Sequence, residues 1–165
     1  MISIDREIIM KRTLVLIMAA SVAACSSPET TSNIPDEPAE AVAAKGMDAT
    51  EIANALKSAG LPVSDIVTLT EDTDDNNMMG RPGMYVSKVY FVDERYRGKG
   101  MKPEEQNTIE TFATEEDATK RKKYIEGVIE GMPMFNQYII QSGKSVLRLD
   151  RALKPSEAKT YEAAL

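Results

Sequence analysis

The pattern of apolar and polar residues changes twice along the chain. A short apolar run over residues 13–22, TLVLIMAASV, comes first and directly follows two basic residues. Residues 26–47 are rich in Ser, Thr, Pro, Glu and Ala, and their few large apolar side chains bury too little surface to offset the entropy cost of ordering them. From residue 48 to residue 165, alternating and helix-spaced apolar positions predict a single folded domain.

Three stretches of this domain have the apolar spacing and the end signals of helices. Residues 48–51, Asp-Ala-Thr-Glu, fit a capping box that opens the first helix. Thr114, followed by three acidic residues, is a suitable N-cap for the second helix. Pro155 suits the first turn of the third. The first helix is expected to end at Gly60 and the second at Gly131.

Five further segments are rich in β-branched and aromatic residues and are predicted to be strands. The resulting order, α-β-β-β-α-β-β-α with short connections, predicts an α+β fold: a mostly antiparallel five-stranded sheet with helices packed on it. The expected strands are Val63–Thr70, Met84–Val92, Thr108–Ala113, Gln137–Gln141 and Ser145–Asp150.

The strand at 84–92, MYVSKVYFV, has the clearest alternation of the five. Because side chains alternate between the two faces of a strand, every second residue is expected to share a face. This predicts Tyr85 together with Ser87, Val89 and Phe91 on one face. The opposite face then carries Val86, Lys88, Tyr90 and Val92.

Charge excludes one class of partner. The 165 residues carry a net charge of −6, and without residues 1–24 the net charge is −7. An acidic surface repels phosphate backbones, so nucleic acid is not an expected partner. It also gives no polybasic attraction to anionic lipid headgroups.

The N-terminal segment has the features of a secretory signal. Lys11 and Arg12 precede about ten apolar residues and then small ones, which is the order of a signal peptide. The apolar run is shorter than the ~20 residues of a membrane-spanning helix. Asp5 and Glu7 are untypical of a signal, so translation is expected to start at Met10. Residues 1–24 are thus predicted to be a signal peptide.

The single cysteine of the chain lies directly after this segment. Val22-Ala23-Ala24-Cys25 resembles the lipobox of bacterial lipoproteins. The resemblance implies that the chain is cleaved before Cys25, whose thiol carries a diacylglycerol, and two acyl chains give stable anchoring. The alternative is an ordinary signal peptide that leaves an idle thiol. The lipobox therefore implies a lipid anchor at Cys25 on the extracytoplasmic face of the cell membrane.

Residues 25–47 are then expected to be the lipidated cysteine and a flexible tether. A coil of this length places the domain of residues 48–165 at about 25 Å from its anchor, from about 5–6 Å × √n for n residues. The tether contains Pro28, Pro35 and Pro38, which stiffen it locally.

Candidate chemistry is sparse. The chain has no histidine, the commonest acid–base residue, and one cysteine. No catalytic residue, metal ligand or cofactor is therefore assigned, and the protein is not expected to be an enzyme. Arg95-x-x-Gly98-x-Gly100 resembles the acyl-CoA loop of GNAT acetyltransferases, but a strand is expected after it where that loop opens a helix.

Two further patterns leave a metal carrier open as an alternative. Asp72-x-Asp74-x-Asn76 resembles the first half of an EF-hand loop but lacks its later glycine and glutamate, so a solvated acidic loop is expected. Methionine thioethers are ligands for copper(I). However, Met132-Pro133-Met134-Phe135 is more simply explained as a packed loop.

Five short motifs are spread over about 100 residues of the domain: G-R-P-G at 80–83, S-K-V at 87–89, F-A-T at 112–114, A-L-K-P at 152–155 and Y-E-A-A-L at 161–165. Through these motifs the domain resembles small extracytoplasmic lipoproteins of Gram-positive actinobacteria. The resemblance implies a membrane-anchored domain and no catalytic role. The expected function is a binding or interaction module for a small ligand or an envelope protein. An extracytoplasmic enzyme, a metal carrier and a structural envelope component are the alternatives.

Overall fold

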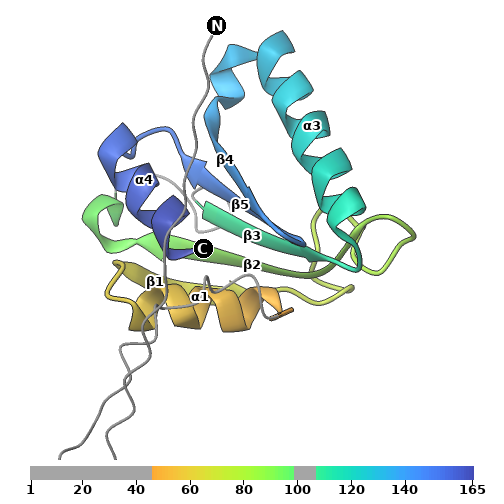
Figure 1. Cartoon of the computed structure of the whole chain (residues 1–165), viewed down its shortest axis with the longest axis horizontal. Helices are drawn as coiled ribbons and strands as arrows, with labels where there is room; N and C mark the ends of the chain where they lie inside the picture. Colours follow the sequence, from red (N-terminus) through yellow and green to blue (C-terminus); the bar gives the residue numbers. More distant parts are fainter. Residues whose placement is uncertain (1–45, 99–106) are drawn as a thin grey trace, which may run out of the picture. The chain divides into compact units, whose positions relative to one another are not determined.

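A five-stranded antiparallel sheet with helices on both faces forms the described part of the chain (Figure 1). The computed structural model describes residues 46–98 and 107–165, all of which belong to one compact unit. The predicted signal peptide, Cys25 and the tether up to residue 45 lie outside these residues.

The element order confirms the α+β prediction. Each strand begins and ends within two residues of the expected position. The elements are α1 (Ala49–Ser58), β1 (Val63–Thr68), β2 (Tyr85–Asp93), the 3-10 turn η2 (Glu94–Tyr96), β3 (Asn107–Phe112), α3 (Glu115–Gly131), the 3-10 turn η3 (Pro133–Phe135), β4 (Gln137–Ser142), β5 (Ser145–Asp150) and α4 (Pro155–Ala164).

The strands lie in the order β1-β2-β3-β5-β4, and each neighbouring pair is antiparallel. β1, β2 and β3 follow one another along the chain, and β4 and β5 form a hairpin. Consequently the pairing of β3 with β5 is the single contact between neighbouring strands that are not consecutive in the sequence, and α3 lies in the connection between them.

The caps expected for the first two helices are present. The carboxylate of Asp48 accepts a hydrogen bond from the backbone N–H of Glu51, and the carboxylate of Glu51 accepts one from the backbone N–H of Asp48, both at 2.8 Å. At α3 the hydroxyl of Thr114 accepts from the backbone N–H of Asp117 at 3.1 Å. These bonds satisfy backbone donors that have no partner within the helix.

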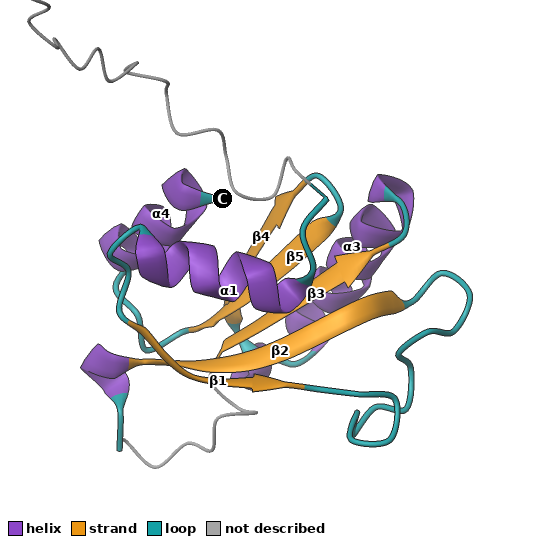
Figure 2. Cartoon of the chain, turned by 90° about the horizontal axis from the view of Figure 1, so that it is seen from below, coloured by secondary structure: helices purple, strands orange, loops and turns teal. Residues whose placement is uncertain are grey.

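The main hydrophobic core lies on the face of the sheet that carries α1 and α4 (Figure 2). Met47, at the end of the predicted tether, already packs against it. Burying each large apolar side chain contributes about 1.5–3 kcal/mol, so this face holds most of the stabilising apolar area. The sheet contributes Val63, Val89, Phe91, Ile109, Leu147 and Leu149 to this core.

The opposite face, which carries α3, has a smaller apolar cluster, and here one prediction is wrong. The pairing of β2 with β3 shifts between Tyr85, opposite Phe112, and Ser87, opposite Thr111. The extra residue in β2, Val86, is exposed. A bulge of this kind reverses the alternation. Tyr85 therefore packs on the α3 face against Phe112, Ala118 and Val146, and not with Val89 on the α1 face.

Candidate functional site

Three neighbouring strands, β2, β3 and β5, each contribute a charged residue near the middle of the α3 face of the sheet. Lys88 of β2 lies directly opposite Glu110 of β3. On the other side of β3, Arg148 of β5 is paired with Thr108, two residues before Glu110. The side chains of Lys88 and Glu110 are 1% and 0% exposed. Since burying a charge is costly unless it is paired and hydrogen-bonded, each needs a nearby counter-charge.

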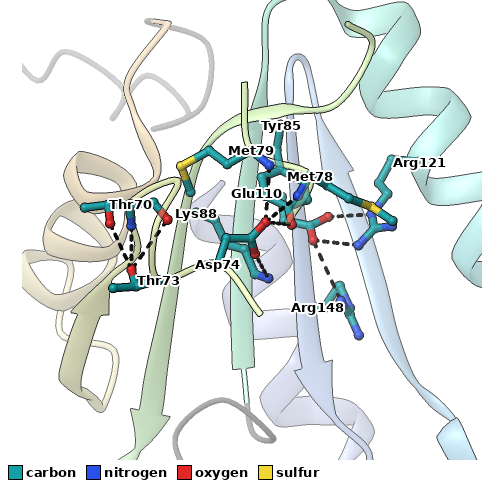
Figure 3. Close-up of polar contacts among 10 residues, drawn as sticks. All are labelled: Thr70, Thr73, Asp74, Met78, Met79, Tyr85, Lys88, Glu110, Arg121 and Arg148. Carbon is teal, nitrogen blue, oxygen red and sulfur yellow. Dashed lines mark hydrogen bonds and ion pairs between the residues drawn. The ribbon is translucent and has the colours of Figure 1, made fainter. Parts of the chain in front are cut away.

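Asp74, in the long connection between β1 and β2, is the counter-charge of Lys88 (Figure 3). One carboxylate oxygen accepts from the ammonium of Lys88 at 2.9 Å. The other accepts from the hydroxyl of Tyr85 at 2.6 Å and from the backbone N–H groups of Met78 and Met79 at 2.8 and 3.2 Å. These four bonds hold the connection against the sheet.

The expectation of a solvated acidic loop at residues 72–76 holds for Asp72, Asp75 and Asn76, which are exposed, but is wrong for Asp74. Its side chain is fully buried, and its oxygens are directed at Lys88 and the sheet. The bonds it accepts come from donors of the chain itself, as expected for a structural carboxylate. Within residues 46–98 and 107–165, no three His, Cys, Asp or Glu side chains are grouped in a way that could hold a metal ion.

The pKa values in this pair shift in the directions that keep both groups charged. Burial alone would raise the pKa of Asp74, but the hydrogen bonds from Tyr85, the backbone of Met78 and Lys88 outweigh it and hold the pKa well below its ordinary value. For Lys88, burial alone would lower the pKa, but Asp74 and Tyr90 outweigh it and raise the pKa. The Lys88–Asp74 pair is therefore ionised at neutral pH.

Glu110 is shared by two arginines. Arg121 of α3 donates from Nε and Nη2 to its two carboxylate oxygens, both at 2.8 Å. Arg148 is farther away, with Nη1 at 3.8 Å from Glu110 Oε1, and its Nε donates to the amide oxygen of Gln137 at 2.7 Å. Burial and, to a lesser degree, the nearby Arg121 lower the pKa of Arg148. Arg148 is thus the less well neutralised of the two arginines.

Together these side chains form what we call the charge cluster, and it is not neutral. It contains three cationic groups and two carboxylates, so one positive charge has no counter-charge within it. This excess lies in a chain whose net charge is −6. The charge cluster consists of Asp74, Lys88, Glu110, Arg121 and Arg148.

A cavity of about 290 Å³ lies against the charge cluster, between α3, the β4–β5 hairpin and the connection that holds Asp74. Of the described residues that line it, only Arg121 and Arg148 are charged. Half of the lining side chains are apolar and half carry polar groups, and convergent polar groups beside apolar surface are a feature of small-molecule sites. The other lining residues are Asn76, Met78, Tyr124, Ile125, Val128, Ile129, Phe135 and Gln137.

The rim of this cavity is apolar and exposed, which corrects a second expectation. Tyr124 and Phe135 line the cavity and are largely exposed, and Met132 is nearly half exposed. Met134 is 73% exposed. The Met-Pro-Met-Phe segment at 132–135 is therefore not a packed loop. The methionines Met78 and Met79, by contrast, pack against the smaller apolar cluster.

The loop that resembles an acyl-CoA site has a structural role in its described part. Arg95 donates to both carboxylate oxygens of Asp93, at 2.9 and 2.6 Å, and lies 3.4 Å from Glu157. The hydroxyls of Tyr96 and Tyr161 donate to Glu157 and Asp93, at 2.6 and 2.9 Å. These contacts join the end of β2 to α4. The next described element is the expected strand, β3.

No family profile, curated protein or solved structure matches the chain. The resemblance to bacterial lipoproteins therefore stays a prediction from the residues that carry it, with Cys25 outside the described residues. Among the helices that the structure describes, none is long and apolar enough to cross a membrane.

Sequence reasoning missed the whole charge cluster, although a signal was present. The strands MYVSKVYFV and TIETFA each contain one charged residue, Lys88 and Glu110, and VLRLD contains Arg148 between two leucines and Asp150 at its end. Residues at such positions are often buried and need partners, and charges of opposite sign on adjacent strands suggest a shared network. The partners Asp74 and Arg121 come from a loop and a helix, whose positions the pattern of the strands does not give.

Proposed function

We propose that this protein is a lipid-anchored binding module on the extracytoplasmic face of the cell membrane, and that the cavity beside α3 is its binding site. The observation that carries the proposal is the contrast between this cavity and the rest of the molecule. The chain is acidic, yet the cavity has two arginines beside the apolar side chains of α3. Such a combination suits recognition of a small molecule.

The lining of the cavity favours binding over catalysis. General acid–base catalysis requires a group whose pKa lies near the working pH, and nucleophilic catalysis requires an activated hydroxyl, thiol or amine. The described lining has two arginines, two amides, one tyrosine and otherwise apolar side chains. Guanidinium groups stay protonated and orient anions, which is the role of a binding residue.

The anchor is supported by the lipobox at 22–25 and by the composition of the tether that follows it. Cys25→Ala removes the thiol that would carry the diacylglycerol. We expect the variant to move from the membrane fraction to the soluble fraction of the cell envelope. Ser26→Ala, one residue away, should stay with the membrane. Membrane association that survives in Cys25→Ala would overturn the anchoring.

The exposed rim supports a second candidate, which is docking of an envelope protein. Met134 and Phe135 present apolar surface close to the cavity, and clustered exposed apolar side chains are typical of interaction sites. A pull-down from solubilised envelope tests it: one stoichiometric partner that is lost in Phe135→Ser would favour protein docking. Recovery of the same partner with Phe135→Ser would count against docking at the rim.

A further inference from the structure

We propose that the cavity beside α3 binds a small monocarboxylate with an apolar body, and that Arg148 receives the carboxylate. This inference rests on the proposed function as a binding module and names the ligand class of the same site. It is carried by the free donors of Arg148, the unbalanced charge of the charge cluster and the apolar side chains that α3 contributes to the cavity.

Arg148 has donors left over at the cavity. Its Nε donates to Gln137, but Nη1 is 3.8 Å from the nearest carboxylate oxygen, which is beyond hydrogen-bond length. No acceptor in the described chain takes a hydrogen bond from Nη1 or Nη2. The side chain is 24% exposed and lines the cavity. Largely buried polar groups normally have a partner, so these donors are suited to an acceptor supplied by a ligand.

The charge of the site selects a monoanion. One positive charge in the charge cluster lacks a counter-charge, so one negative charge in the cavity would balance it. A dianion, such as a phosphate monoester, would leave one excess negative charge beside the apolar side chains of α3, which is costly. The planar fork of a guanidinium also matches a carboxylate through two parallel hydrogen bonds. In Figure 3 the side chains of Arg121 and Arg148 reach Glu110 from α3 and from β5.

The α3 side of the cavity favours a ligand whose remaining part is apolar and small. Ile125, Val128 and Ile129 of α3 form one wall, and Tyr124 and Phe135 lie near the rim. The volume of about 290 Å³ is close to the lower limit of the usual ligand range, ~300–1,000 Å³. A ring or short chain that carries one carboxylate therefore fits the site better than a long lipid.

Two matched probes test the assignment. The probes are 4-phenylbutyrate and its uncharged amide, 4-phenylbutyramide, which share one carbon skeleton. Binding to the full chain in nanodiscs is measured by titration calorimetry, with empty nanodiscs as the blank. We expect the carboxylate to bind at least about 10-fold more tightly than the amide, since hydrogen bonds between charged groups are the stronger ones.

Variants then test the role of Arg148. Arg148→Gln should remove the preference for the carboxylate. Arg151→Gln, which deletes the same charge from an exposed position three residues away, should keep it. Arg148→Lys retains the positive charge but cannot form the two parallel hydrogen bonds of a guanidinium, so its affinity for the carboxylate should fall about 3-fold or more. If Arg148→Gln does not fold, Arg148→Lys decides, and wild-type affinity in that variant overturns the proposal.

The possible failures are distinguishable. If the two probes bind equally and Tyr124→Ala weakens both, the cavity is a binding site but the carboxylate assignment is wrong. A probe concentration of about 10 mM would reveal binding with a Kd of about 1 mM. If neither probe binds at that concentration, the assignment of this ligand class is overturned. The anchoring half of the proposed function is decided separately by membrane fractionation of Cys25→Ala.

Discussion

Replacement of Lys88 by methionine tests whether the charge cluster holds the α3 face together. Methionine keeps an unbranched side chain of similar length but removes the ammonium. The carboxylate of Asp74 would then be fully buried with three neutral donors, from Tyr85 and from the backbones of Met78 and Met79. A buried carboxylate without a counter-charge is strongly unfavourable.

The magnitude follows from the burial of both partners. Removing one member of a buried ion pair costs about 3–5 kcal/mol of unfolding free energy. The methionine side chain recovers part of this through apolar burial, so we expect a loss of about 3 kcal/mol at pH 7. Since domains of this kind have a total stability of about 5–15 kcal/mol, the variant should still fold and its unfolding can be measured.

The loss should also depend on pH, with a defined sign. The native pKa of Asp74 lies well below its unfolded value, so the stability it contributes is present above an unfolded pKa of about 3.9 and is lost as the pH falls through the native pKa. Without Lys88 the native pKa of Asp74 rises, and the variant relieves its unpaired charge by protonation at a higher pH than the wild type. The difference in stability should therefore narrow between about pH 5 and pH 3.

Urea unfolding at pH 7 and pH 4 measures both effects. The matched control is Lys120→Met on α3, because Lys120 is 65% exposed and its ion pair with Glu116 lies on the surface. The control should have the midpoint of the wild type. If Lys88→Met and Lys120→Met unfold at the same urea concentration at pH 7, the reasoning is refuted.

Two further predictions concern other parts of the fold. Tyr161→Phe removes the hydroxyl that donates to Asp93 at 2.9 Å and should lower the unfolding free energy by about 1 kcal/mol in chemical denaturation; an unchanged midpoint would mean that this bond between β2 and α4 adds nothing. Gly80 has φ +73°, and a Cβ there would lie 2.7 Å from Glu71 Oε1, so Gly80→Ala should lower the unfolding free energy by about 1 kcal/mol. Gly127 lies inside α3 with open space around it, so Gly127→Ala should raise the unfolding free energy by about 0.5–1 kcal/mol. Thermal unfolding midpoints that shift in the same direction in both variants would contradict this.

The elements of the fold could be predicted from the sequence because their signals are local. The capping residues Asp48 and Thr114 and the alternation in β2 each act within a few positions. The faces of β2 were predicted wrongly at Tyr85 because a bulge depends on how two strands pair, and the pattern of one strand does not contain that information.

The candidate site could not be predicted from the sequence for a related reason. Lys88 and Asp74 are 14 residues apart, and Glu110 finds its partners in a helix and in a strand beyond that helix. Their pairing is a property of the tertiary arrangement. The exposure of Met134 and Phe135 was also missed, because apolar residues near a proline can equally form a packed loop or an exposed rim.

The order of the strands has a consequence for assembly. The β1–β2–β3 meander and the β4–β5 hairpin are each built from neighbours in the sequence, and they meet only where β3 pairs with β5. Glu110 of β3 lies at this pairing, with its Oε1 3.8 Å from Nη1 of Arg148 in β5. The cavity is lined by residues from both halves, such as Met78 and Gln137. A ligand in the cavity would therefore contact both halves of the sheet, so that binding would stabilise the pairing of β3 with β5.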